Sequence, residues 1–118
     1  MTDHVHHTID YVEIYVVDLA ATRSFYAAAF GWEFNDYGPE YAGIRWVRGE
    51  GEVGGLNAMR TPVRGGPLVL VWSADLDATL AAVIAAGGDV VEGPYDFPGG
   101  RRFHFTDPSG NELGVWGA

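Results

Sequence analysis

The 118-residue sequence contains no cysteine, and all seven of its basic residues are arginine rather than lysine. The absence of cysteine excludes disulfide bonds, thiolate nucleophiles and cysteine-ligated metal sites. The absence of lysine excludes Schiff-base chemistry and the lysine of a phosphate-binding P-loop. Carboxylate, imidazole, phenol and guanidinium groups therefore remain as the candidate chemistry.

The chain also lacks an apolar run near the ~20 residues that span a bilayer, and it lacks a basic N-terminal region followed by an apolar one. We therefore expect a cytoplasmic protein that does not insert into a membrane. The formal net charge of −9 repels phosphate backbones, so nucleic acid is not an expected partner. His4, His6 and His7 precede the first patterned segment, where they form either a metal clip or, as we favour, a solvated arm.

The order of the expected elements occurs twice. In each half a strand is followed by an Asp that can cap a helix, by an amphipathic helix and by three more strands. The expected helices are 19–30 and 76–86, and the expected strands are 9–17, 32–37, 41–48, 53–60, 68–73, 89–92, 101–106 and 112–116. The stretch 94–100 reads as a loop.

A constant offset of 57 residues relates the two halves, with Asp18 matching Asp75 and Leu56 matching Leu113. We expect repeat one to cover about residues 9–60 and repeat two about 67–117. Each unit is then a βαβββ module. The predicted fold is α+β: two modules that form a cup-shaped mixed sheet with the helices on its convex side.

Several short motifs occur along the chain in a family's order. They are Val16-Val17-Asp18-Leu19, Phe25-Tyr26, Phe30-Gly31-Trp32, Gly54-Gly55-Leu56, Ala74-Asp75-Leu76-Asp77 and Phe105-Thr106-Asp107-Pro108-Ser109-Gly110-Asn111. Through these motifs and their order the chain resembles the vicinal oxygen chelate superfamily, which includes glyoxalases, bleomycin and fosfomycin resistance proteins and extradiol dioxygenases. The resemblance covers nearly the whole chain, as a single glyoxalase-like domain over residues 1–118. It implies paired βαβββ modules, a homodimer and a site in the cup.

The resemblance also implies a divalent metal on the cup-facing side of the first and last strands of each module. In this sequence the positions that match the family's metal ligands are Tyr11, Asn57, Leu68 and Gly114. Leucine and glycine offer no side-chain donor, a protonated phenol is a poor ligand, and an amide supplies one neutral oxygen. Zinc, iron or manganese sites want three or more imidazole or carboxylate donors. We therefore predict no metal ligands and no cofactor.

Strand alternation sorts the remaining side chains into helix-facing and cup-facing sets. The residues expected to bind a ligand from the cup are Tyr11, Tyr15, Arg45, Asn57, Met59, Trp72, Arg102 and Trp116. This set is largely aromatic and apolar with a few polar groups, which is typical of a site for a small, partly aromatic organic molecule. Trp72 and Trp116 fit equally well in a dimer interface.

Two residues are candidates for catalysis. Glu13 lies among aromatic side chains, so it is either a general base or one half of an ion pair with Arg45, Arg102 or protonated His104. His104 is either an acid–base group or a structural histidine whose ring nitrogens are hydrogen-bonded within the protein. Arg102 either binds a carboxylate or phosphonate with two hydrogen bonds or lies at a solvated rim beside Arg101.

The sequence is compatible with three functions. The first is a glyoxalase/bleomycin-resistance-like protein that binds a small molecule in a metal-free cup, with or without chemistry assisted by Glu13. The second is a metal-dependent lyase, isomerase or dioxygenase of the same superfamily. The third is a dimeric interaction module with a filled cup. The sequence leaves open whether the protein is an enzyme, and it does not name the ligand.

Overall fold

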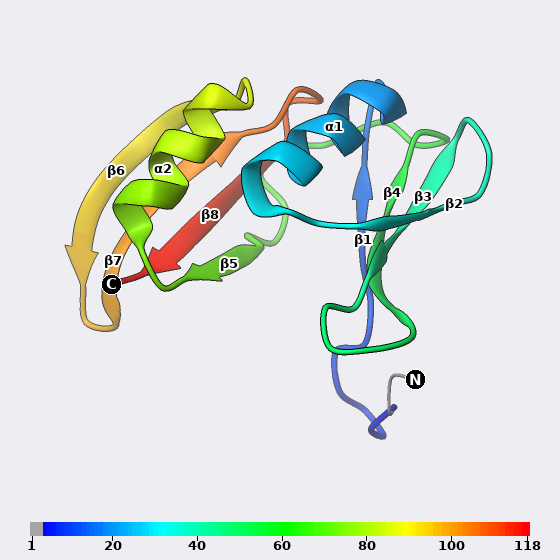
Figure 1. Ribbon diagram of the computed structural model, residues 1–118, viewed down its shortest axis with the longest axis horizontal. Helices are drawn as coiled ribbons and strands as arrows, with labels where there is room; N and C mark the ends of the chain where they lie inside the picture. The colour runs from blue at the N-terminus through cyan, green and yellow to red at the C-terminus, as the bar shows by residue number, and fades with distance from the viewer. Residues whose placement is uncertain (1–3) are drawn as a thin grey trace.

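The computed structural model describes residues 4–118. The strands form two separate four-stranded sheets, one from each half of the chain, and both helices lie along one side of them (Figure 1). This confirms the predicted α+β class with two βαβββ modules. In residues 4–118 no helix is long and apolar enough to cross a bilayer.

The first module contains β1 (Val12–Tyr15), α1 (Leu19–Phe30), β2 (Phe34–Asp36), β3 (Tyr41–Arg45) and β4 (Glu52–Asn57). Its strands lie in the order β1-β4-β3-β2, with β1 and β4 parallel and the other neighbours antiparallel. The Asp18 carboxylate accepts a hydrogen bond from the Ala21 N–H at 3.0 Å, and Gly31 ends α1 at φ 72°. Such a cap stabilises a helix by about 1 kcal/mol.

The second module contains β5 (Leu70–Ser73), α2 (Leu76–Ala85), β6 (Asp89–Phe97), β7 (Gly100–Thr106) and β8 (Glu112–Gly117). The order β5-β8-β7-β6 repeats that of the first sheet, again with a parallel pair at one edge. Asp75 caps α2 as Asp18 caps α1. The expected loop at 94–100 was wrong: β6 continues to Phe97 through two register shifts, because Gly93 and Pro94 occupy a bulge rather than a turn.

The constant offset of 57 was also wrong beyond the helices. Ile14 pairs with Leu56, whereas its counterpart Val71 pairs with Val115. Leu56 therefore corresponds to Val115 rather than to Leu113. By the same registers Tyr41, not Arg45, is the counterpart of Arg102.

One core joins the modules. Phe25 and Phe30 of α1 lie against Phe105 of β7, each with ring centroids 5.8 Å apart. Tyr26 is fully buried, and its hydroxyl donates to the Asp107 carboxylate at 2.8 Å. The helices thus cover one face of each sheet and leave the other face open, and these open faces carry the polar side chains described next.

Candidate functional site

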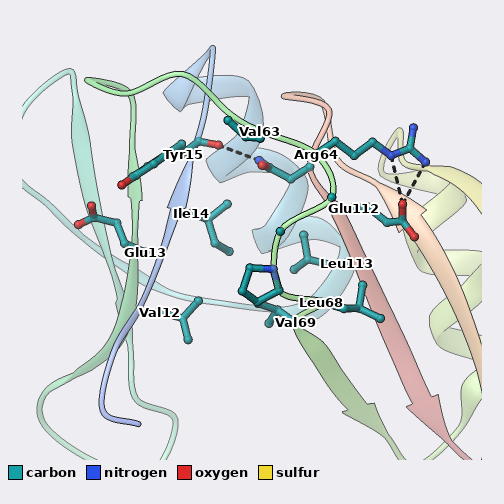
Figure 2. Close-up of a pocket in the computed structure, with 14 residues that line it drawn as sticks. Val12, Glu13, Ile14, Tyr15, Val63, Arg64, Leu68, Val69, Glu112 and Leu113 are labelled. Carbon is teal, nitrogen blue, oxygen red and sulfur yellow. Dashed lines mark hydrogen bonds and ion pairs between the residues drawn. The ribbon is translucent and has the colours of Figure 1, made fainter.

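A cleft of about 460 Å³ lies between the modules. One wall is β1, and the others are the 63–69 connection and the start of β8 (Figure 2). Glu13 and Tyr15 line it from β1 with side chains that point outward, and Arg64 and Glu112 pair with each other at its far side. Val63, Pro67 and Leu68 supply apolar surface. The volume suits a small organic molecule.

The β7–β8 turn closes one side of this cleft. The Asn111 side-chain amide donates to the Tyr15 carbonyl at 2.8 Å, and the Ser109 hydroxyl accepts from the Val17 N–H at 2.8 Å. Ser109 also bonds the Thr22 hydroxyl at 2.8 Å. These contacts hold the second module against β1 and α1, so the two walls of the cleft keep their spacing.

On the first sheet, the open face is a cluster of phenols and carboxylates. Glu13 accepts from the Tyr41 hydroxyl and from the Asn57 amide, both at 3.0 Å. The Tyr41 hydroxyl lies 2.5 Å from that of Tyr11. Tyr11 in turn contacts Glu52 at 3.5 Å.

Glu52 also accepts from Asn35 at 2.9 Å and from Tyr37 at 2.6 Å. Burial, followed by the neighbouring carboxylates, raises the pKa of the Tyr11 phenol, although its bond to Tyr41 opposes this. Burial first, and then the bonds to Tyr11 and Glu13, raise the pKa of Tyr41 strongly. The bond to Glu52 is the main cause that raises the pKa of Tyr37. The phenols therefore stay protonated and act as donors to the two carboxylates.

Two glycines make this cluster possible. A Cβ on Gly55 would lie 2.1 Å from the Tyr41 hydroxyl oxygen and 2.7 Å from that of Tyr11. A Cβ on Gly43 would lie 2.1 Å from a carboxylate oxygen of Glu52. The side chains of the cluster can lie across the sheet only because these two positions have no side chain.

On the second sheet, the open face carries imidazole, guanidinium and indole groups. His104 is 6% exposed, and its Nδ1 lies 2.9 Å from a Glu112 oxygen while its Nε2 lies 2.9 Å from the Tyr95 hydroxyl. Arg102 donates from Nε to that same hydroxyl. Arg64 and His104 hold the pKa of Glu112 below its ordinary value, with the His104 hydrogen bond as the largest cause.

The structure brings together some of the predicted site residues. Tyr11, Glu13 and Asn57 meet in the first cluster, and Arg102 and His104 meet in the second. Trp116 packs edge-on against Phe97 beside Arg102. Trp72 is paired in register with Trp116 and is 61% exposed. Glu13 is paired with neutral donors rather than with any of the three cations considered above.

Other predicted residues lie apart from these clusters. Arg45 follows a β-bulge and pairs with Glu33 at 3.3 Å, beside a separate groove near Trp46. Met59 is 59% exposed, and only its backbone N–H reaches the cluster, at Asn57 Oδ1. The Tyr15 side chain is partly exposed in the cleft. At the N-terminus, His4 pairs with Asp10 at 2.6 Å and the rings of His6 and His7 stack, all in an exposed segment.

Sequence reasoning missed several members of both clusters, namely Tyr37, Tyr41, Glu52, Arg64, Tyr95 and Glu112. The period of two could have found Tyr41 and Glu112, because they alternate with residues already placed in the cup. Tyr95 was hidden by its assignment to a loop. No sequence signal brings Arg64 to Glu112, since 48 residues separate them.

Comparison with known proteins agrees with this architecture. The sequence profile described as "Glyoxalase/Bleomycin resistance protein/Dioxygenase superfamily" matches residues 8–115. The chain belongs to this superfamily. The fold and the residues together thus confirm the resemblance to the vicinal oxygen chelate proteins.

Two relatives illustrate the range of this superfamily. The putative glyoxylase CFP32 of Mycobacterium tuberculosis is 29% identical over 119 residues, which cover 94% of this chain and 46% of that protein. The anthracycline biosynthesis protein DauV of Streptomyces sp. (strain C5) is 32% identical over 113 residues, covering 92% of this chain and 40% of that protein. The chain therefore spans less than half the length of these relatives.

Solved structures of the superfamily share the fold. A glyoxalase-related enzyme from Fulvimarina pelagi superimposes with a TM-score of 0.77 at 19% identity, covering 95% of this chain and 88% of the other. TnmS3, an antibiotic binding protein from Streptomyces sp. CB03234, has a TM-score of 0.71 at 23% identity, covering 97% and 98%. At these identities the likeness concerns the fold.

The metal positions implied by the superfamily do not fit a metal here. Asn57 uses its amide N–H on Glu13 and its carbonyl oxygen on the Met59 N–H at 2.7 Å. The raised pKa of Tyr11 keeps its phenol protonated, and Leu68 and Gly114 have no donor. Within residues 4–118, no three His, Asp or Glu side chains gather in a way that could hold an ion. The donor set is that of a hydrogen-bonding site.

Proposed function

We propose that the protein binds a small, planar, partly aromatic molecule in the cup without the metal used elsewhere in the superfamily. The observation that carries the proposal is the state of the Asn57 and Glu13 side chains. Glu13 accepts from two uncharged donors, and Asn57 bonds Glu13 and the Met59 N–H, at the place where a metal ligand set would begin. The same carboxylate lines a cleft of suitable size.

The walls of the cleft favour a ligand with a flat apolar body and polar edges. Glu13 has two donors but about four lone-pair directions, so it can accept another hydrogen bond from a ligand. Arg64 and Glu112 offer a donor and an acceptor on the opposite wall. Leu70 and Trp72, 38% and 61% exposed, extend an apolar surface along β5. Exposed apolar groups of this kind are typical of binding sites.

The names of two similar proteins point to the same class of ligand. One is an anthracycline biosynthesis protein and the other an antibiotic binding protein. For this chain we propose sequestration of such a molecule, in the cytoplasm and as a homodimer. Sedimentation of the purified protein tests the dimer directly.

The binding test uses chelator-treated protein and the fluorescence of the exposed Trp72. We expect an anthracycline or a comparable flat aromatic compound to quench it with a Kd in the micromolar range, unchanged by added chelator. Glu13→Gln should weaken binding about tenfold, because a hydrogen bond to a charged acceptor is replaced by a weaker one. Glu33→Gln is the matched control, since Glu33 is exposed and bonds Arg45 instead.

Two results would overturn the proposal. One is the failure of every flat aromatic compound to bind at millimolar concentration. The other is protein purified without chelator that carries about one iron, manganese, zinc or nickel ion per chain and loses ligand binding when that ion is removed. The second result would favour a metal-dependent lyase, isomerase or dioxygenase. A cup filled by Trp72 and Trp116 of a second copy would instead favour an interaction module.

A further inference from the structure

A continuous chain of hydrogen bonds crosses the open face of the second sheet. It begins at Arg64, whose Nε donates to Glu112 at 3.1 Å, and passes from Glu112 to His104 at 2.9 Å. It continues from His104 to the Tyr95 hydroxyl at 2.9 Å and ends at Arg102. Four segments distant in sequence supply these groups: the 63–69 connection, β8, β7 and β6.

The two arginines fix the direction of the two end bonds in this chain. A guanidinium only donates, so Tyr95 accepts from Arg102 at one end and Glu112 accepts from Arg64 at the other. An ionised Glu112 also accepts from His104, which places a proton on Nδ1. In the tautomer with its only proton on Nδ1, His104 has a lone pair on Nε2 that accepts the Tyr95 hydroxyl proton.

This arrangement leaves Tyr95 with one free lone pair and a route by which its own proton can leave. If a bound group gives a proton to the Tyr95 oxygen, the original hydroxyl proton moves to Nε2 of His104. One O–H bond of the ligand breaks, one N–H bond of the imidazole forms, and Tyr95 ends with the proton it received. The resulting imidazolium is paired with the Glu112 carboxylate, and the ligand anion lies beside the Arg102 guanidinium.

The surroundings of Arg102 favour an aromatic anion. Its guanidinium carbon lies 5.4 Å from the Tyr95 ring centre and 5.3 Å from that of Phe97. No carboxylate pairs with Arg102 among residues 4–118. Trp116 and Trp72 continue the same row of side chains across β8 and β5. A flat ring can therefore lie against the indoles with an oxygen directed at Arg102.

We propose that Tyr95 is an acid–base residue of the cup, and that its ligand is an aromatic molecule with an acidic hydroxyl group, a phenol. Such a ligand binds as the phenolate while His104 takes up the proton through Tyr95. This rests on the proposed function, because the ligand must first occupy the cup, and it adds the chemical class of the ligand and a proton-transfer step.

The charged and titratable groups around His104 come from every neighbouring strand. Tyr95 and Glu92 face it from β6, Arg102 from β7 and Glu112 from β8, with Arg64 behind Glu112. Glu92 is the register partner of His104, is exposed, and forms no hydrogen bond to the imidazole. Glu112 is therefore the carboxylate that stabilises a charged His104, and Glu92 provides a matched comparison.

The test uses 4-nitrophenol, whose ionised form absorbs visible light and whose neutral form does not. At a pH at which most of the free dye is neutral, we expect the wild-type protein to bind it mainly as the coloured phenolate. Glu112→Gln should lower the ratio of ionised to neutral bound dye about tenfold or more, since the imidazolium loses its charged partner. Glu92→Gln should leave that ratio unchanged. His104→Gln should abolish the colour while the dye still binds.

Several outcomes would overturn the inference. Wild-type protein that binds only neutral dye contradicts it, and so does a His104→Gln variant that ionises the dye as well as wild type. If His104→Gln fails to fold, the comparison of Glu112→Gln with Glu92→Gln still tests the inference, because Glu112 is more exposed than His104. If nitrophenols do not bind but aromatic compounds without a hydroxyl do, this inference fails while the proposed function stands. If neither class binds, both fail.

Discussion

The open faces of the two sheets share a backbone framework but differ in chemistry. In register order, Tyr15, Asn57 and Tyr41 of the first sheet correspond to Trp72, Trp116 and Arg102 of the second. In the next row, Glu13, Gly55 and Gly43 correspond to Leu70, Gly114 and His104. The first face carries carboxylates bound by neutral donors, and the second carries cations and indoles.

The difference shows which positions of a duplicated module can change freely. The helix-facing positions remain apolar in both halves, for example Ile14 and Val71, or Leu56 and Val115. Their burial holds the fold together, at about 25 cal/mol for each Å² of apolar surface removed from water. The open faces contribute little to that core, so their side chains can differ between the modules without loss of the fold.

The largest expected loss of stability comes from a substitution in the β7–β8 turn of the second module. Asp107 in the β7–β8 turn is 5% exposed and accepts from Tyr26, from the Ser109 and Asn111 N–H groups and from the Asn111 amide. Asp107→Ala should lower the free energy of unfolding by about 3 kcal/mol, because several buried donors lose their acceptor. Urea denaturation measures this loss.

A carboxylate of the first module provides the control for that measurement. Asp36 bonds Arg23 at the surface, so Asp36→Ala should cost at most about 0.5 kcal/mol. Equal losses from the two substitutions would show that Asp107 does not fasten the modules together.

Gly55 and its counterpart Gly114 test whether the cluster on the first sheet depends on the absence of a side chain at position 55. Gly55→Ala should cost about 1–3 kcal/mol and separate the Tyr11 and Tyr41 hydroxyls, since both oxygens lie within 2.7 Å of the added carbon. The Cβ of Gly114→Ala would lie 2.5 Å from the end of the Leu70 side chain and 3.3 Å from the Phe103 carbonyl oxygen, and Leu70 is 38% exposed and can rotate. Its cost should be clearly smaller. Thermal unfolding of both variants ranks them, and the reverse order would contradict the role given to Gly55.

Alkaline titration distinguishes the phenols of the first module. Burial raises the pKa of Tyr26 well above the usual value, and Tyr11 and Tyr41 are also raised. A raised pKa in the folded state contributes stability below the unfolded pKa of about 10, and that stability is lost as the pH rises further. We expect part of the phenolate absorbance to appear only above that pH, together with unfolding. Tyr41→Phe should reduce this late part.

Acid titration gives the smallest effect and concerns the second face. The pKa of Glu112 is lowered mainly by its bond to His104, so its stabilising contribution is present above the unfolded pKa of about 4.3 and is lost as the pH falls below it. The Glu112 side chain is 27% exposed, so solvent screens part of this interaction and the effect should stay below about 1 kcal/mol. Unfolding of wild type and Glu112→Gln should differ at neutral pH and converge near pH 3. A constant difference would contradict the coupling.

Local patterns were sufficient to predict the helices, their Asp caps and the βαβββ order of elements along each module. Alternation placed Glu13, Tyr11 and Asn57 on one face, because a strand has a fixed period of two. The constant offset of 57 residues misplaced the counterpart of Arg102, since register shifts at Ile44 and Val90 change the spacing between the halves. A bulge inserts a residue without a distinctive composition, so the sequence does not reveal it.

Side-chain pairing was the part that the sequence could not supply. One of the two interpretations of Glu13 paired it with a cation, yet it bonds Tyr41 and Asn57, which lie 28 and 44 residues away. The His104 chain depends on Arg64, which lies between the expected strands 53–60 and 68–73. Such pairs are set by how two sheets come together, and no local rule in the chain specifies that.

The β7–β8 turn has a consequence for how the chain folds as it is synthesised. Its bonds to Val17, Thr22, Tyr26 and the Tyr15 carbonyl join residues 81 to 96 positions apart. The first half can form its helix and strands early, but Tyr26 has no partner for its hydroxyl until Asp107 leaves the ribosome. Contacts of such long range slow folding. In the nascent first module, one side of α1 therefore stays uncovered until the β7–β8 turn has been translated.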